Sequence, residues 1–116
     1  MDEIILVKES IKLDILKNIA SENDSDLVKA VVDIKLLTIA IGGYMHADEE
    51  KFLLEEGSVQ DNLWGINIYP DKDRKDWIEF DSMINIRPRQ NNRSRGVEDT
   101  AIQKKIIDII ARLITP

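Results

Sequence analysis

The chain of 116 residues contains no cysteine and no long apolar segment. Without cysteine it cannot form disulfide bonds or thiolate zinc sites, and it has no cysteine nucleophile. A membrane-spanning helix needs about 18 continuous apolar residues. The apolar run at residues 4–7 is far shorter. It also follows the acidic residues Asp2 and Glu3, so it does not have the pattern of a signal peptide. We therefore expect a cytoplasmic protein without a membrane partner.

Histidine and phosphate-binding motifs are also scarce. His46 is the only histidine, which excludes a polyhistidine metal site, and no glycine-rich phosphate loop is present. The net charge is −6, and an acidic surface repels phosphate, so a nucleic-acid partner is not expected. Apolar residues make up 43% of the chain, enough for one core in a single domain spanning residues 1–116.

Hydrophobic periodicity predicts three helices and two hairpins. Their sum is an α+β fold with an antiparallel sheet of four to five strands and about three helices packed on one face. The predicted elements are a strand at 4–7, a helix over 13–20, a hairpin of 27–34 and 36–41, a helix over 47–55, a hairpin of 63–69 and 77–87, and a helix over 100–114.

The segment 77–87 is predicted to be the longest strand. Its apolar and polar residues alternate, so that Ile78, Phe80 and Ile84 would share the buried face. The opposite face, which continues onto the strand 63–69, would be polar.

The start of the helix at 47–55 carries a possible metal site. His46, Asp48 and Glu49 offer the imidazole and carboxylate ligands that a divalent ion accepts. The alternative is structural, because acidic residues in the first turn of a helix stabilise the positive end of its dipole.

Two carboxylates on the predicted polar face are candidates for catalysis. Glu79 and Asp81 are two positions apart on one strand, and paired carboxylates can serve as general acid and base. Such pairs also occur on any solvated sheet face, so this pattern alone does not identify an active site.

The most specific functional signal is an arginine-rich segment. Residues 87–95 hold four arginines and no acidic residue, and they lead to the start of the last helix. Guanidinium groups and free helical N–H groups are suited to recognise phosphate or carboxylate. The alternative is that the arginines pair with the protein's own carboxylates and hold the loop in place. The predicted ligand-binding residues are Arg87, Arg89, Asn92, Arg93, Ser94 and Arg95, together with Asn67 and Asn85 of the polar face.

Four sequence blocks resemble a known family. They are HADEE at 46–50, NLWGINIYP at 62–70, IEFDSMINIRP at 78–88 and NRSRGVED at 92–99. The chain is similar in these blocks to small prokaryotic single-domain proteins that share a domain of unknown function. The similarity extends from about residue 28 to the last helix and implies no activity, cofactor or partner.

We predict a binding module whose polar sheet face and arginine-rich loop take a small anionic ligand or an acidic protein segment. A small hydrolase, metal-dependent or carboxylate-based, is the first alternative. The second is a structural homo-oligomer, in which a homodimer would form through a sheet edge or the last helix. The sequence predicts no particular cofactor.

Overall fold

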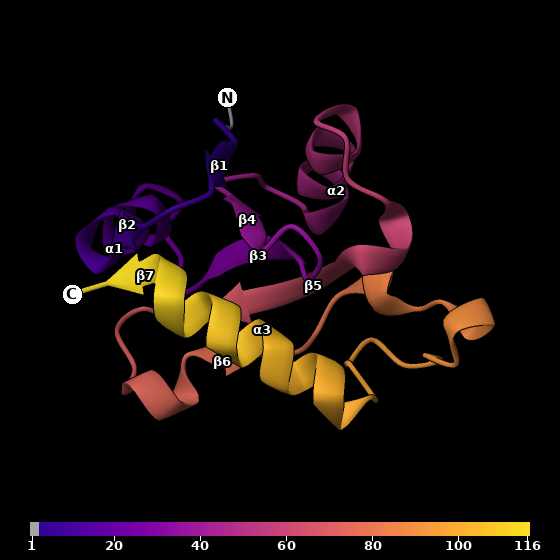
Figure 1. Ribbon diagram of the computed structural model, residues 1–116. Helices are drawn as coiled ribbons and strands as arrows, with labels where there is room; N and C mark the ends of the chain where they lie inside the picture. Colours follow the sequence, from indigo (N-terminus) through magenta and orange to yellow (C-terminus); the bar gives the residue numbers. More distant parts are fainter. Residues whose placement is uncertain (1–2) are drawn as a thin grey trace.

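A five-stranded antiparallel sheet forms the centre of the molecule (Figure 1). The computed structural model describes residues 3–116, and its strand order is β1-β4-β3-β5-β6. Three helices pack on this sheet, and a short parallel pair, β2 with β7, lies beside it. The predicted α+β class is therefore confirmed. The strands of the main sheet are β1 (Ile5–Val7), β3 (Val28–Asp33), β4 (Thr38–Ile41), β5 (Leu63–Ile68) and β6 (Ile78–Glu79); the small pair is β2 (Ile11–Lys12) and β7 (Ile114–Thr115); the helices are α1 (Leu13–Glu22), α2 (His46–Glu55) and α3 (Thr100–Leu113).

The largest core lies between the sheet and the helices α1 and α3. Residues Ile106 and Ile110 of α3 and Leu16 of α1 are fully buried against alternate residues of β3, such as Ala30. The apolar residues of α3 recur at helical spacing and so form one continuous face. Asp99 caps this helix by accepting a hydrogen bond from the backbone N–H of Ala101.

The helix α2 covers the opposite face of the sheet, which differs from the predicted arrangement of all helices on one face. Leu53 of α2 packs with Val31, Ala40 and Leu63, whose side chains point away from the larger core. Both faces of β3 and β4 are apolar at this end, so both must be covered. At its other end the α2 side of the sheet carries Lys29 and polar neighbours, and a pocket opens there.

Both predicted hairpins form, but the return strand of the second is much shorter than expected. The pairs β3–β4 and β5–β6 are antiparallel. The predicted strand 77–87 is wrong after Glu79, because residues 83–85 form a 3-10 turn that Ser82 caps through its hydroxyl. The predicted shared face is wrong too: Ile78 and Phe80 contact the larger core, whereas Ile84 contacts the α2 side.

Among residues 3–116, no helix is long and apolar enough to cross a membrane.

Candidate functional site

A polar pocket of about 500 Å³ lies on the α2 side of the sheet, beside the first turn of α2. Its volume is within the usual range for small-molecule sites. Apolar side chains such as Met45 and Ile84 line part of it. Its polar lining comes from separate segments of the chain and comprises Lys29, His46, Asn67, Tyr69, Glu79, Asp81, Ser82 and Arg95.

Three of these residues form a row across the sheet. Lys29 of β3 lies opposite Asn67 of β5, and Asn67 lies opposite Glu79 of β6. The amide Nδ2 of Asn67 donates to Glu79 Oε1 at 2.8 Å and to the backbone oxygen of Asp81 at 3.4 Å. Both partners are acceptors, which fixes the orientation of the amide. Its Oδ1 is buried without a partner in residues 3–116, so a ligand would reach it only after neighbouring side chains shift.

A second hydrogen bond holds Glu79 in position. The hydroxyl of Tyr69 donates to the same Oε1 atom at 3.1 Å. Burial, together with this hydrogen bond and the charge of Glu79, raises the pKa of the Tyr69 hydroxyl, so it remains a donor at neutral pH. Glu79 is thus oriented by two neutral donors, neither of which is a cation that would pair with its carboxylate.

Asp81 and Arg95 form an ion pair at the edge of the pocket, with 2.6 Å between Asp81 Oδ1 and Arg95 Nε. Both side chains are about half exposed, at 40% and 54%. An exposed pair of this kind contributes about 0–1 kcal/mol to stability. The pair therefore places charge at the pocket without being needed to hold the fold together.

His46 is the first residue of α2 and is largely buried. Its Nε2 lies 2.8 Å from the backbone oxygen of Ile66. A carbonyl oxygen can only accept, so Nε2 carries the proton and Nδ1 is the acceptor nitrogen of the neutral ring. Burial lowers the pKa of His46, and this outweighs the opposing effect of the Ile66 hydrogen bond.

We expect His46 to make stability fall as the pH is lowered. Because the pKa is lower in the folded than in the unfolded state, the unfolded chain binds more protons as the pH drops below about 6.5. The loss reaches at most about 1.4 kcal/mol per pH unit for one proton and ends below the folded-state pKa. Urea denaturation of the wild type and His46→Gln at pH 7.5 and 5.5 measures it. The carboxylates titrate in both proteins and lower the unfolding free energy of both. If the wild type and His46→Gln lost equal unfolding free energy between the two pH values, the prediction for His46 would be contradicted.

The predicted metal ligands do not converge. His46 is bound to the sheet, and Glu49 Oε2 accepts a hydrogen bond from the backbone N–H of Gly43 at 3.0 Å. Asp48 is exposed and does not line the pocket. Within residues 3–116 no group of three or more potential ligands is placed to hold an ion.

Many of the side chains that were predicted to bind an anion are bonded to other groups of the protein instead. Arg87 is buried, stacks on Trp64 with 4.2 Å from its guanidinium carbon to the ring centre, and donates to the backbone oxygens of Gln60 and Leu63. Burial lowers the pKa of Arg87. Arg89 lies outside the pocket and pairs with Asp61 at 2.6 Å.

The predicted ligand-binding asparagine of this loop, Asn92, is structural as well. Asn92 is buried, and its Nδ2 donates to three backbone oxygens, including that of Asn85 at 2.7 Å. The backbone N–H groups of Arg93 and Ser94 donate to Glu98, which lowers the pKa of that carboxyl. The Arg93 and Ser94 side chains are outside the pocket. Of the eight predicted ligand-binding residues, the pocket contains Asn67 and Arg95.

The pocket is better equipped for binding than for covalent chemistry. His46 can accept a proton, and Glu79 and Asp81 supply carboxylates. Its serine, Ser82, is 1% exposed and caps the 3-10 turn, so the Ser82 hydroxyl is not available as a nucleophile. The side chains can therefore hold a polar ligand by charge and hydrogen bonds.

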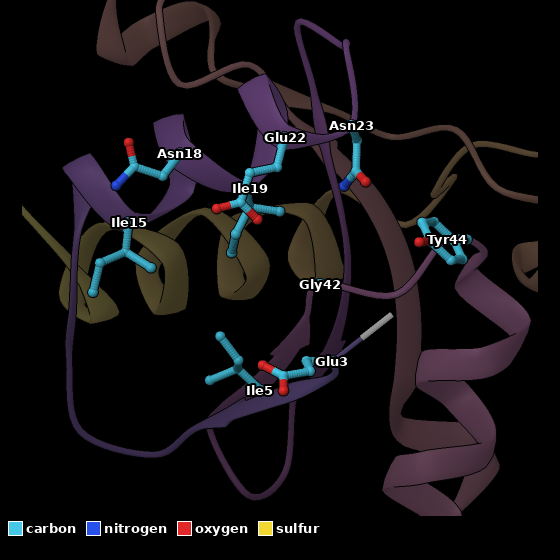
Figure 2. A pocket seen from close by; sticks show the side chains of 9 residues that line it. All are labelled: Glu3, Ile5, Ile15, Asn18, Ile19, Glu22, Asn23, Gly42 and Tyr44. Carbon is cyan, nitrogen blue, oxygen red and sulfur yellow. The ribbon is translucent and has the colours of Figure 1, made fainter. Parts of the chain in front are cut away.

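A second cavity of about 390 Å³ lies between α1 and β1 (Figure 2). Figure 2 shows Ile5 and Ile15 at one end and Tyr44 at the other. Its charged residues, Glu3 and Glu22, have the same sign. Two carboxylates among amides and apolar groups do not define a ligand, so the pocket beside α2 is the stronger candidate.

Sequence reasoning missed Lys29. This residue lies on a strand that was predicted as one half of the first hairpin, and its partner Asn67 lies on the second. Nothing in the local pattern indicates that these two hairpins pair with each other. Tyr69 ends the strand that was predicted at 63–69, but only the structure shows its hydrogen bond to Glu79.

These features define a small α+β domain with a polar pocket on one face of its antiparallel sheet. The chain belongs to the family described as protein of unknown function (DUF5674). The model of this family matches residues 5–113. This match confirms the predicted resemblance to a family with a domain of unknown function. No curated protein and no solved structure matches the chain.

Proposed function

We propose that the protein is a small-ligand-binding module and that its site is the pocket beside α2. The observation that carries this proposal is the convergence of charged and hydrogen-bonding side chains from separate segments on one cavity of about 500 Å³. A cavity of this size suits a small molecule better than a protein segment.

Three features of the pocket support a ligand with an anionic group. Lys29 and Arg95 bring positive charge to the lining. The first turn of α2 also lines it, and the positive end of a helix dipole favours an anion. This retains the anionic ligand predicted from the sequence but assigns it to a largely different set of residues. Of the predicted ligand-binding residues, only Asn67 and Arg95 line the pocket.

Inorganic phosphate is the probe for this proposal. We expect phosphate to shift the backbone amide NMR signals of Lys29, His46 and Arg95. Replacing Arg95 with glutamine should weaken this binding about tenfold, because a hydrogen bond to a charged group contributes about 1.5–3 kcal/mol. The change should leave the unfolding free energy within about 1 kcal/mol of the wild type.

Arg89→Gln provides a matched control. Arg89 is also about half exposed and is paired with an aspartate at 2.6 Å, but it lies outside the pocket. Its replacement should leave phosphate binding unchanged. Equal weakening by the two variants would show that phosphate responds to overall charge and would contradict the proposed site. So would the absence of any shift with phosphate and with a panel of amino acids, nucleotides and sugar phosphates.

A further inference from the structure

Lys29 and Glu79 are the two charged side chains of the pocket without an ion-pair partner in the described residues 3–116. Asp81 is neutralised by Arg95, and His46 is neutral because its pKa is lowered by burial. In the part of the chain that the structure describes, the Glu79 side chain is hydrogen-bonded to the neutral groups of Asn67 and Tyr69 alone. The pocket therefore presents one uncompensated positive charge and one uncompensated negative charge.

These two charges lie on either side of Asn67. Neighbouring strands are about 4.8 Å apart, so the backbones of Lys29 and Glu79 are separated by about 10 Å across β5. The intervening Asn67 ties Glu79 Oε1 toward itself. A ligand that lies over Asn67 would meet Lys29 at one end and the remaining carboxylate oxygen of Glu79, Oε2, at the other.

We propose that the ligand is a small zwitterion, with its ammonium group against Glu79 and its carboxylate or other anionic group against Lys29. This inference rests on the proposed binding function and names the chemical class of the ligand. A molecule with a single negative charge would pair with Lys29 but would leave Glu79 unpaired and would be repelled by it. A molecule with a single positive charge would pair with Glu79 but would leave Lys29 unpaired and would be repelled by it. Only a zwitterion therefore pairs with both charged side chains of the row.

The ligand class is tested with probes that differ only in charge and length. The zwitterions are glycine, 4-aminobutyrate and 6-aminohexanoate, which cover short, intermediate and long separations of the two charges. The singly charged analogues are butylammonium and butyrate. Each is titrated into ¹⁵N-labelled protein at pH 7.5 and constant ionic strength, and the amides of Lys29, Asn67 and Glu79 report binding.

We expect one of the zwitterions to bind about tenfold more tightly than either singly charged analogue. Glu79→Gln keeps an acceptor for Asn67 and Tyr69 but removes the charge. It should abolish the advantage of the zwitterion over butyrate. Lys29→Met should abolish its advantage over butylammonium, whereas Lys104→Met, an exposed change on α3, should alter neither.

The outcomes separate this inference from the proposed function. If phosphate or butyrate shifts the pocket amides but no zwitterion binds more tightly than its singly charged analogues, the zwitterion inference is overturned and the binding module stands. If neither phosphate, nor any zwitterion, nor the panel of metabolites shifts these amides, both are overturned.

Discussion

Replacing Asn85 with alanine is expected to lower the free energy of unfolding by about 3–5 kcal/mol. The Asn85 side chain is fully buried and acts as a substitute for a neighbouring strand. Its Oδ1 accepts from the N–H of Gly65 at 2.8 Å, and its Nδ2 donates to the oxygen of Gly65 at 2.9 Å. Nδ2 also donates to the oxygen of Arg95 at 2.9 Å. Alanine would leave the N–H and the oxygen of Gly65 buried and unsatisfied, which is more costly than the loss of a solvated hydrogen bond. The oxygen of Arg95 would keep its hydrogen bond from the backbone N–H of Ser82.

Urea denaturation followed by circular dichroism measures the effect, and Asn18→Ala is the control. Asn18 is an exposed residue of α1, so its replacement should change stability by less than about 0.5 kcal/mol. A loss below about 1 kcal/mol for Asn85→Ala would show that water or a backbone shift replaces the amide. That result would contradict the structural role given to Asn85.

Replacing Arg87 with methionine is expected to cost about 3 kcal/mol. Methionine keeps much of the apolar stem that packs on Trp64 but removes both donors to the backbone oxygens of Gln60 and Leu63. The change leaves the oxygen of Leu63 without this donor, whereas the oxygen of Gln60 still accepts from the backbone N–H of Leu63. Lysine in place of arginine should give an intermediate loss, because an ammonium group lacks the fork that reaches two acceptors at once.

The same denaturation experiment tests this expectation, with Arg89→Met as its control. Arg89 is exposed and pairs on the surface, so its replacement should cost no more than about 1 kcal/mol. If Arg87→Met and Arg89→Met were equally stable, the buried arginine would not support the loop. Phosphate binding should survive Arg87→Lys, since Arg87 does not line the pocket.

Most of the secondary structure could be predicted because it depends on local patterns. The apolar residues of α3 recur at helical spacing, and the two strands of the first hairpin are rich in β-branched residues and are joined by a short turn. These signals are contained within a few neighbouring residues. They locate an element along the chain, but they do not determine which side of the sheet it covers, and the position of α2 was therefore predicted incorrectly.

The segment after β6 could not be predicted because one of its side chains forms the hydrogen bonds to β5 that the backbone of a continued strand would form. Alternation of apolar and polar residues predicted a strand through Arg87, but Asn85 pairs with Gly65 in place of the main chain. The close packing at Gly65 has the same origin, since a Cβ atom there would lie 2.6 Å from the Cβ of Ser82. Such pairings depend on contacts between distant segments, which periodicity does not reveal.

The candidate site was predicted in part, and for a similar reason. His46, Glu79 and Asp81 were identified by their chemistry, but they were assigned to two separate sites. The structure brings all three to one pocket because β6 pairs with β5, because β5 also pairs with β3, and because His46 of α2 is hydrogen-bonded to Ile66 of β5. Lys29 has an unremarkable sequence context, and only this strand order makes it part of the site.

The small pair of β2 and β7 has a consequence for how the chain is made. Thr115 donates from its hydroxyl to the backbone oxygen of Ile11, a residue 104 positions earlier. During synthesis, β2 has no partner until almost all of this sequence has left the ribosome. The central hairpins can pair earlier, because their contacts are closer in sequence. The edge of the molecule near α1 therefore closes after the central hairpins, and a chain that ends before Ile114 would leave β2 without its partner strand.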